Sequence, residues 1–242
     1  IELESGFASS WLTPRLSTFT AMHPDVRLHL NISQQGVEFS GETEIAVKWG
    51  SGYWPGFEVE WLMEAPLVPM CAPSILRTRK LRTPNDLTHH VLLHDRQLTH
   101  WTIWAQVAKV SGLDTTAGHI FQDTLALEQA AIRGHGIALY CMELGRGALE
   151  RGDLVIPLPD HSITGLGDYF LDMQRKRLST VATDFIKWLR AVIAAEKRPM
   201  QLAEPSKKIG ERAYVVGSLE GSAYGKYIKS TNSTKPASRQ RI

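Results

Sequence analysis

The stretch from Glu44 to Ser74 constrains the fold more than any other part of this 242-residue sequence. It opens with a short strand pattern, Glu44 to Trp49, in which Ile45 and Val47 share one face. A glycine-rich loop follows, and Phe57 to Cys71 is then too interrupted by prolines to form a helix. An extended run of this kind suits a segment that leaves one sheet and enters another. The sequence therefore predicts two sheets with a cleft between them, and clefts are where ligands bind.

The segments before this stretch alternate between helix and strand patterns. Ser9 or Ser10 is the predicted N-cap of a first helix, whose apolar positions recur at spacings of three and four. These positions are Leu12, Leu16, Phe19 and Met22. Val26 to Ile32 then alternates as a strand. This β-α-β-β beginning predicts an α/β fold with a mostly parallel sheet.

The second half of the chain continues the same alternation of patterns. Leu125 to Arg133 is a predicted helix with Asp123 or Thr124 as its N-cap, and Gly134 is its stop signal. An extended run from Asp168 to Gln174 is a candidate for the return crossover. The other predicted elements are a capped turn at 83–87, strands at Val91–His94, Ile137–Cys141 and Leu154–Ile156, and helices at Met142–Arg151 and Thr180–Ala195.

The composition is that of a globular protein with 43% hydrophobic residues. No apolar run approaches the roughly 20 residues that a membrane helix needs, so no membrane association is predicted. The beginning of the chain has no signal-peptide pattern. Cys71 and Cys141 both lie in apolar, strand-like surroundings, which predicts buried packing residues and no disulfide. These features indicate a cytoplasmic location.

The charge is unevenly distributed along the chain. Residues 197–242 carry ten Lys or Arg and three Asp or Glu, a net +7, so residues 1–196 carry −5 of the total +2. The body of the protein is therefore not expected to bind nucleic acid. The basic segment 197–242 is rich in Ser, Lys and Gly and is predicted to be a disordered tail.

Several segments together carry a family resemblance. They are FASSWLTPRLSTFTAMHPDVRLHL, EIAVKWGSGYWPG, VPMCAPSIL, LRTPNDLTHHVLLHD, FQDTLALEQAAIRGHGIALY and LERGDLVIPLP. In this order and spacing they resemble the effector-binding domain of LysR-type transcriptional regulators. The W-P-G loop and the LLHD segment are most similar to the branch that contains glycine-cleavage activators.

The resemblance implies a fold, an assembly and a function. The fold would have two Rossmann-like subdomains joined by two crossover strands, as in type II periplasmic binding proteins. Subdomain I would span 1–68 and 164–196, and subdomain II 69–163. The domain would bind a small-molecule effector, form a homodimer or homotetramer, and need no cofactor. It would reach DNA only through an N-terminal winged helix-turn-helix, which this sequence lacks.

The same resemblance places candidate ligand contacts at the ends of strands. Ser5, Gly6 and Phe7 precede a helix whose free amides and dipole would favour a carboxylate, so a carboxylate or amino acid is the expected effector. An alternative is that the serines only cap this helix. The other candidates are Ser33, Gln34, Trp49, Gly50, His94, Asp95, Asp123 and Thr124. For Trp49 the alternative is ordinary core packing, and for Thr124 it is helix capping.

Other chemistry finds less support in the sequence. His89, His90, His94 and His100 cluster near Asp95, but their spacing fits no zinc signature, so structural or surface histidines are predicted. No nucleophile elbow, phosphate-binding loop or paired cysteines are present, so no enzymatic activity is predicted. A solute-binding protein of a transporter, with the same two-lobed shape, is the alternative function.

Overall fold

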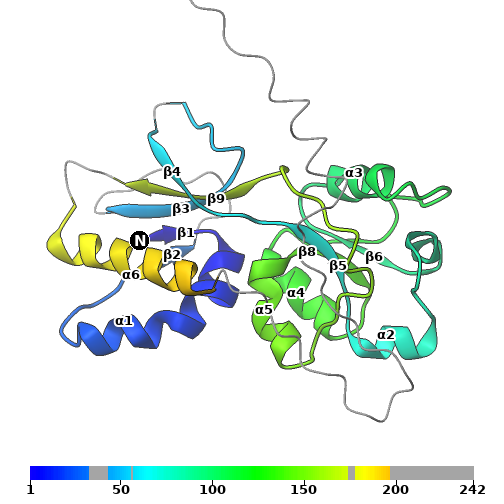
Figure 1. Ribbon diagram of the computed structural model, residues 1–242, viewed down its shortest axis with the longest axis horizontal. Helices are drawn as coiled ribbons and strands as arrows, with labels where there is room; N and C mark the ends of the chain where they lie inside the picture. Colours follow the sequence, from blue (N-terminus) through cyan, green and yellow to red (C-terminus); the bar gives the residue numbers. More distant parts are fainter. Residues whose placement is uncertain (33–42, 56, 174–177, 197–242) are drawn as a thin grey trace, which may run out of the picture.

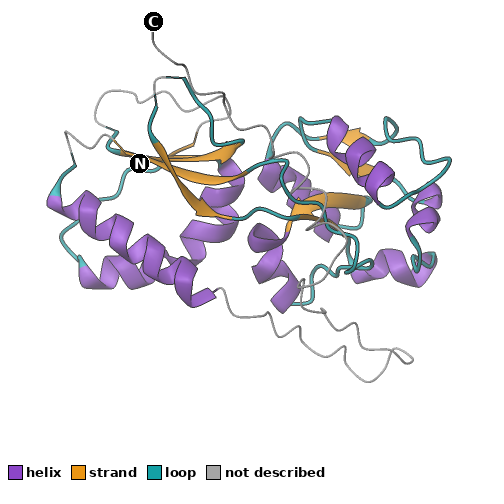
Figure 2. Cartoon of the chain, turned by 45° about the horizontal axis from the view of Figure 1, so that its top comes forward, coloured by secondary structure: helices purple, strands orange, loops and turns teal. Residues whose placement is uncertain are grey.

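The chain folds around two separate sheets. The computed structural model describes residues 1–32, 43–55, 57–173 and 178–196, so the predicted tail at 197–242 lies outside the described residues. We call the part built on the first sheet lobe I (residues 1–63 and 168–196), and the part built on the second sheet lobe II (residues 67–163). Figure 2 shows the two sheets apart from each other, each flanked by helices. This arrangement confirms the predicted α/β fold.

Lobe I has a five-stranded sheet of order β2-β1-β3-β9-β4. Its strands are β1 (Glu2–Leu3), β2 (Asn31–Ile32), β3 (Ile45–Gly50), β4 (Val59–Met63) and β9 (Asp168–Met173). The first three are mutually parallel, whereas β9 runs antiparallel to both β3 and β4. The predicted mostly parallel sheet is therefore mixed, because the return strand β9 runs opposite to its neighbours β3 and β4.

Lobe II has a four-stranded sheet of order β5-β8-β6-β7. Its strands are β5 (Leu67–Met70), β6 (Leu92–His94), β7 (His119–Ile120) and β8 (Ile137–Cys141). Its helices are α2 (Pro73–Thr78), the 3₁₀ turn η3 (Pro84–His89), α3 (Thr99–Val107), α4 (Thr124–Ile132) and α5 (Met142–Glu150). Asp123 caps α4 by accepting a hydrogen bond from the Ala126 amide, and Gly134 adopts a φ of 75° just after the helix. Both predicted helix boundaries are thus confirmed.

Two short connections join the lobes. The predicted crossover from Phe57 to Cys71 contains β4 in lobe I and β5 in lobe II, so the chain changes sheets at 64–66 (Figure 1). It returns at 164–167, because Ile163 still bridges to Leu67 of lobe II and Asp168 begins β9. The predicted return crossover at Asp168 to Gln174 was placed too late, since β9 lies inside the sheet of lobe I. We propose 64–66 and 164–167 as the subdomain boundaries, close to those expected from the sequence.

Asp168 holds the two connections together. Its Oδ1 accepts a hydrogen bond from the Ala65 amide at 3.1 Å, and its Oδ2 accepts one from the Trp61 indole at 3.0 Å. One carboxylate therefore links the first residue of the return strand to the outgoing strand and to the connection itself. This geometry suits a paired hinge, in which both connections bend as one unit.

The first helix begins earlier than predicted. Helical turns run from residue 5 through the π-helical η1 (Phe7–Leu12), the 3₁₀ turn η2 (Thr13–Arg15) and α1 (Leu16–Met22). Ser9 and Ser10 are therefore inside the helix and do not cap it. Pro14 lacks an amide hydrogen, which accounts for the departure from regular α-helical bonding in this region.

The helices α1 and α6 (Thr180–Glu196) lie together on one side of the lobe I sheet (Figure 1). Phe19 meets Phe185 edge-on with 5.1 Å between ring centroids, and the Trp188 indole donates to Thr18 Oγ1 at 2.9 Å. The predicted stripe of α6 buries Phe185, Trp188 and Leu189, which confirms its amphipathic character. On α1, in contrast, only Phe19 is buried, and the predicted core residue Met22 is 58% exposed.

Two of the predicted strands form only in part. Only Asn31–Ile32 of the predicted strand at Val26–Ile32 pairs with a neighbour, although Val26, Leu28 and Leu30 do pack against the core. The predicted strand at Leu154–Ile156 is reduced to one bridge between Val155 and Cys71. In both places the apolar alternation reports which side chains face the core, but no complete hydrogen-bonded ladder forms.

Cys71 and Cys141 are expected to resist thiol reagents in the folded protein. Both are buried and unpaired, and loss of solvation on burial raises the pKa of each thiol to about 12. At pH 8 we expect reaction with Ellman's reagent to be a hundredfold or more slower than in the denatured chain, on the order implied by so small a thiolate fraction. Cys71→Ser and Cys141→Ser variants assign each thiol. Rapid modification of either thiol in the folded protein would contradict this burial.

Candidate functional site

A cavity of about 360 Å³ opens between the two lobes. Lobe I contributes the end of β3 with its following loop, together with Glu4 and Tyr169. Lobe II contributes the loop after β6, the start of α4 and the end of β8. Strand ends and helix starts therefore meet at the cavity, which is where open α/β sheets generally bind ligands.

Four of the predicted site residues line this cavity. Trp49 and Gly50 come from lobe I, and Asp95 and Thr124 from lobe II. The remaining predicted residues that the structure describes, Ser5, Gly6, Phe7, His94 and Asp123, lie outside the cavity lining. Ser33 and Gln34 lie outside the described residues.

The Glu4 carboxylate binds the amides that were predicted to bind a ligand. Its carboxylate accepts hydrogen bonds from the amides of Gly6 at 3.1 Å and Phe7 at 3.0 Å. It also accepts from the hydroxyl of Thr124 at 2.8 Å and from that of Tyr169 at 3.3 Å. The helix start therefore already holds a carboxylate from the protein itself. The bond to Thr124 also connects lobe I to lobe II.

A second carboxylate, which belongs to lobe II, also connects the lobes. Glu128 of α4 is buried, and its Oε2 accepts a hydrogen bond from Ser10 Oγ of lobe I at 2.5 Å. The Tyr140 hydroxyl donates to the same oxygen at 3.3 Å. Both inter-lobe bonds therefore join a hydroxyl to a carboxylate, which is a stronger type of hydrogen bond than one between neutral groups.

Burial keeps the two tyrosines in this region protonated. Loss of solvation, with a further contribution from Glu4, raises the pKa of Tyr169 well above its ordinary value. Loss of solvation, with Glu128 as the next cause, does the same for Tyr140. Both phenols therefore remain hydrogen-bond donors throughout the neutral pH range.

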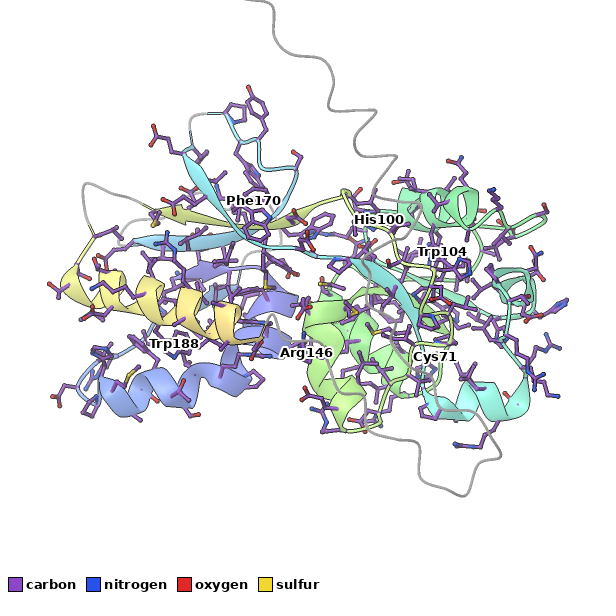
Figure 3. The ribbon with its side chains drawn as sticks, viewed as in Figure 1. Cys71, His100, Trp104, Arg146, Phe170 and Trp188 are labelled. Atoms are coloured by element: carbon purple, nitrogen blue, oxygen red, sulfur yellow. The ribbon has the colours of Figure 1, made fainter. Side chains whose placement is uncertain are left out.

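Trp49 reaches across the cavity toward lobe II. Its ring meets the His100 imidazole edge-on, with 5.8 Å between centroids. His100 Nδ1 lies 3.3 Å from Asp95 Oδ2, and Asp95 in turn accepts the Gln97 amide at 2.8 Å. In Figure 3, His100 lies on the side of lobe II that faces lobe I, whereas Trp104 lies deeper in that lobe. Trp49 is therefore both a wall of the cavity and an inter-lobe contact.

One residue of the cavity lining, Lys48, belongs to a buried ion pair. Lys48 Nζ lies 2.9 Å from Asp172 Oδ2, and both side chains are only 3% exposed. The ammonium group also lies 3.6 Å from the centre of the Phe57 ring. Lys48 alternates with Val47 and Trp49 on β3, so its side chain lies on the opposite face of the strand from theirs. A lysine that is buried there needs such compensation.

Side chains of both charges line the cavity, together with several aromatic rings. Glu4 and Asp95 are acidic, whereas Lys48 and Arg96 are basic. The aromatic contribution comes from Trp49, Tyr53, Trp54, Phe121, Tyr140 and Tyr169. Tyr53 is 78% exposed although it is a large aromatic side chain, and it lies in the loop after β3. Such a cavity suits a small polar ligand that carries charge.

His94 and the two helical tryptophans are structural. His94 is buried, and its Nε2 hydrogen-bonds the Ala117 carbonyl at 2.8 Å. Trp101 and Trp104 are buried and donate to the carbonyls of Leu93 and His161. Within the described ranges, no group of three or more His, Cys, Asp or Glu residues could hold a metal ion.

The sequence analysis missed three residues that shape the site, namely Glu4, Lys48 and Tyr169. Glutamate is not among the favoured N-cap residues, so the nearby serines were the better sequence candidates. An acidic residue next to a helix start was the available signal for Glu4. Tyr169 is distant in sequence from the other cavity residues and reaches them only because β9 returns between β3 and β4.

Comparison with known proteins identifies the family. A sequence model of the LysR substrate binding domain matches residues 1–194. This chain belongs to the LysR substrate-binding domain family. The match covers both lobes.

Individual LysR regulators are similar at moderate identity. The glycine cleavage system transcriptional activator of Escherichia coli is 34% identical over 202 residues, covering 81% of this chain and 65% of the relative. The transcriptional activator AmpR of Pseudomonas aeruginosa is 32% identical over 200 residues, covering 79% of this chain and 64% of the relative. The chain thus spans about 65% of the length of the curated relatives that it matches.

Solved LysR structures share the fold. The effector domain of AmpR from Pseudomonas aeruginosa superposes with a TM-score of 0.71 at 31% identity, covering 81% of this chain and 95% of that domain. The full-length virulence activator AphB of Vibrio cholerae, at 17% identity and a TM-score of 0.59, shares the fold alone. These relatives are transcriptional regulators rather than enzymes, and the alternative of a transporter's solute-binding protein is not favoured. None of the helices in the described part of the chain has the length and apolar character needed to cross a bilayer.

Proposed function

We propose that this chain is the effector-sensing part of a LysR-type transcriptional regulator and binds a small molecule in the cavity between its lobes. The observation that carries this proposal is that the cavity is lined by residues from both lobes, such as Trp49 from one and Asp95 from the other. A ligand at this position contacts both walls only when the lobes are close together. Binding and lobe angle are therefore coupled.

The sensing mechanism follows from this coupling. An effector that fits the closed arrangement better shifts the lobe equilibrium by its differential affinity, on the order of 1–3 kcal/mol. The paired connections held by Asp168 provide the axis of movement. In the whole regulator, the change of lobe angle would re-space the DNA-reading domains of an oligomer. Such a regulator acts on DNA in the cytoplasm.

The proposed effector is an amino acid rather than a simple carboxylate. The sequence favoured a carboxylate because of the amides at the start of the first helix, but the amides of Gly6 and Phe7 bond to Glu4. Lys48 is likewise paired with Asp172, and the cavity lining also contains the acidic Asp95 and the basic Arg96. A small molecule with an ammonium and a carboxylate group matches this mixture of charges better than an anion does.

The first helix is the proposed oligomerisation surface. In α1 only Phe19 is buried, so most of this helix faces outward. The family forms dimers or tetramers by pairing such domains in antiparallel orientation, and we propose that α1 (Leu16–Met22) of one chain lies near α4 (Thr124–Ile132) of another.

One prediction of this proposal concerns ligand binding. A thermal-shift screen of amino acids and small organic acids should find at least one that raises the Tm by about 5 °C at saturating concentration, because a ligand that binds only the folded state stabilises it. Trp49→Ala should reduce that shift, since Trp49 lines the cavity. Val91→Ala, which shortens an exposed apolar side chain outside the cavity lining, should leave it unchanged. If no compound shifts the Tm of the intact folded domain, the sensing function is wrong.

Another prediction of this proposal concerns assembly. Light scattering should give the mass of a dimer or tetramer, and Met22→Glu should shift the protein toward monomer, because it places a charge in an apolar contact. Val91→Glu is the matched control, since Val91 is also an exposed apolar residue but lies outside both α1 and α4. An unchanged mass for Met22→Glu would exclude this surface.

A further inference from the structure

The Glu4 carboxylate has no acceptor position left for a ligand. Each of its oxygens takes two donors, with Gly6 and Thr124 on Oε1 and Phe7 and Tyr169 on Oε2. An ionised carboxylate offers about four lone-pair positions, and all of them are used here. A ligand ammonium group could hydrogen-bond Glu4 only by displacing one of these protein donors.

The four donors form a site built for a carboxylate. Two are backbone amides and two are hydroxyls, and the pKa of the Tyr169 phenol is raised by burial so that it remains a donor. They come from three separate segments, namely the first helix, β9 and the start of α4. All four point at one acceptor group, the Glu4 carboxylate.

The close approach of the lobes at this point is visible at Gly6. A Cβ atom on Gly6 would lie 2.7 Å from Thr124 Cγ2 and 2.9 Å from Leu144 Cδ1, so a larger residue would force these two side chains of lobe II to shift. Glycine here lets the Thr124 hydroxyl reach the Glu4 carboxylate at 2.8 Å. The carboxylate site is thus complete only when the lobes are together.

We propose that Glu4 is a specificity-determining residue, a built-in carboxylate that fills this site and excludes effector carboxylates from this end of the cavity. The inference rests on the proposed ligand cavity, since Glu4, Thr124 and Tyr169 all line it. Any effector carboxylate must then bind elsewhere in the cavity, whose lining also includes the basic residue Arg96. Removing the Glu4 side chain uncovers a latent site for a small carboxylate.

Acetate tests this directly, because it matches the end of a glutamate side chain. In Glu4→Ala, acetate should bind at least about tenfold more tightly than in the wild type and should restore part of the lost thermal stability, which is a rescue by mass action. Chloride at equal ionic strength is the control for salt. Glu150→Ala removes an exposed glutamate and should gain no acetate binding.

Two further variants keep the test decisive. Tyr169→Phe in the Glu4→Ala background should weaken acetate binding, because one of the four donors is lost. Glu4→Gln fills the same space, so this variant should fold and should not gain acetate binding. Folded Glu4→Ala protein with the same acetate affinity as wild type would overturn the proposal. So would tight acetate binding to the wild type that Glu4→Ala does not improve.

The outcome is separable from that of the proposed function. Acetate rescue needs no knowledge of the natural effector, so a failed effector screen with a successful rescue would reject sensing but retain the Glu4 site. A successful screen without rescue would retain sensing and reject the role of Glu4.

Discussion

The bond between the Glu4 carboxylate and the Thr124 hydroxyl is the interaction on which the arrangement of the two lobes depends most. Glu4 belongs to lobe I, and its carboxylate accepts hydrogen bonds from the amides of Gly6 and Phe7 at the start of the first helix of that lobe. Its remaining positions take Tyr169 from the same lobe and Thr124 from the other. One carboxylate thereby joins local helix formation to the closure of the cleft. A hydrogen bond to a charged group of this kind contributes roughly 1.5–3 kcal/mol.

Other features of the interface are consistent with this closure. Ser10 of η1 and Glu128 of α4 form a second hydrogen bond between the lobes. Trp49 contacts His100 at the cavity itself. Asp168 joins the two connections between the lobes by accepting the Ala65 amide. One hydrophobic cluster also runs through both lobes, so a ligand that separates or tightens the two cavity walls would act on these polar contacts together with apolar packing.

Much of the fold was predictable from the sequence because its signals were local. The proline-rich crossover, the Asp123 cap, the stop at Gly134 and the apolar stripe of α6 all depend on residues close in sequence. The start of the first helix was not predictable in this way, because Glu4 rather than a serine accepts its first amides. The return crossover was predicted at β9, because an isolated extended run does not reveal which strands it pairs with.

The candidate site was predictable only in part. Trp49, Gly50, Asp95 and Thr124 follow strands or begin a helix, so the rule for α/β clefts was enough to select them. Gly6 and Phe7 were selected for the same reason, yet their amides bond to Glu4. Tyr169 and Lys48 reach the cavity through strand pairing and a buried ion pair, and both are long-range consequences of the fold. No spacing in the sequence reports such contacts.

A double-mutant cycle between Glu4 and Thr124 tests the central claim most directly. The free energy of unfolding would be measured by urea denaturation for the wild type, Glu4→Gln, Thr124→Val and the double variant. Glu4→Ala replaces Glu4→Gln in a parallel cycle, because a glutamine oxygen can still accept the Thr124 hydroxyl. If the carboxylate and the hydroxyl join the lobes as described, the coupling energy in the Glu4→Ala cycle should be about 1 kcal/mol or more. Effects in that cycle that add to within about 0.5 kcal/mol would contradict this account of how the cleft is closed.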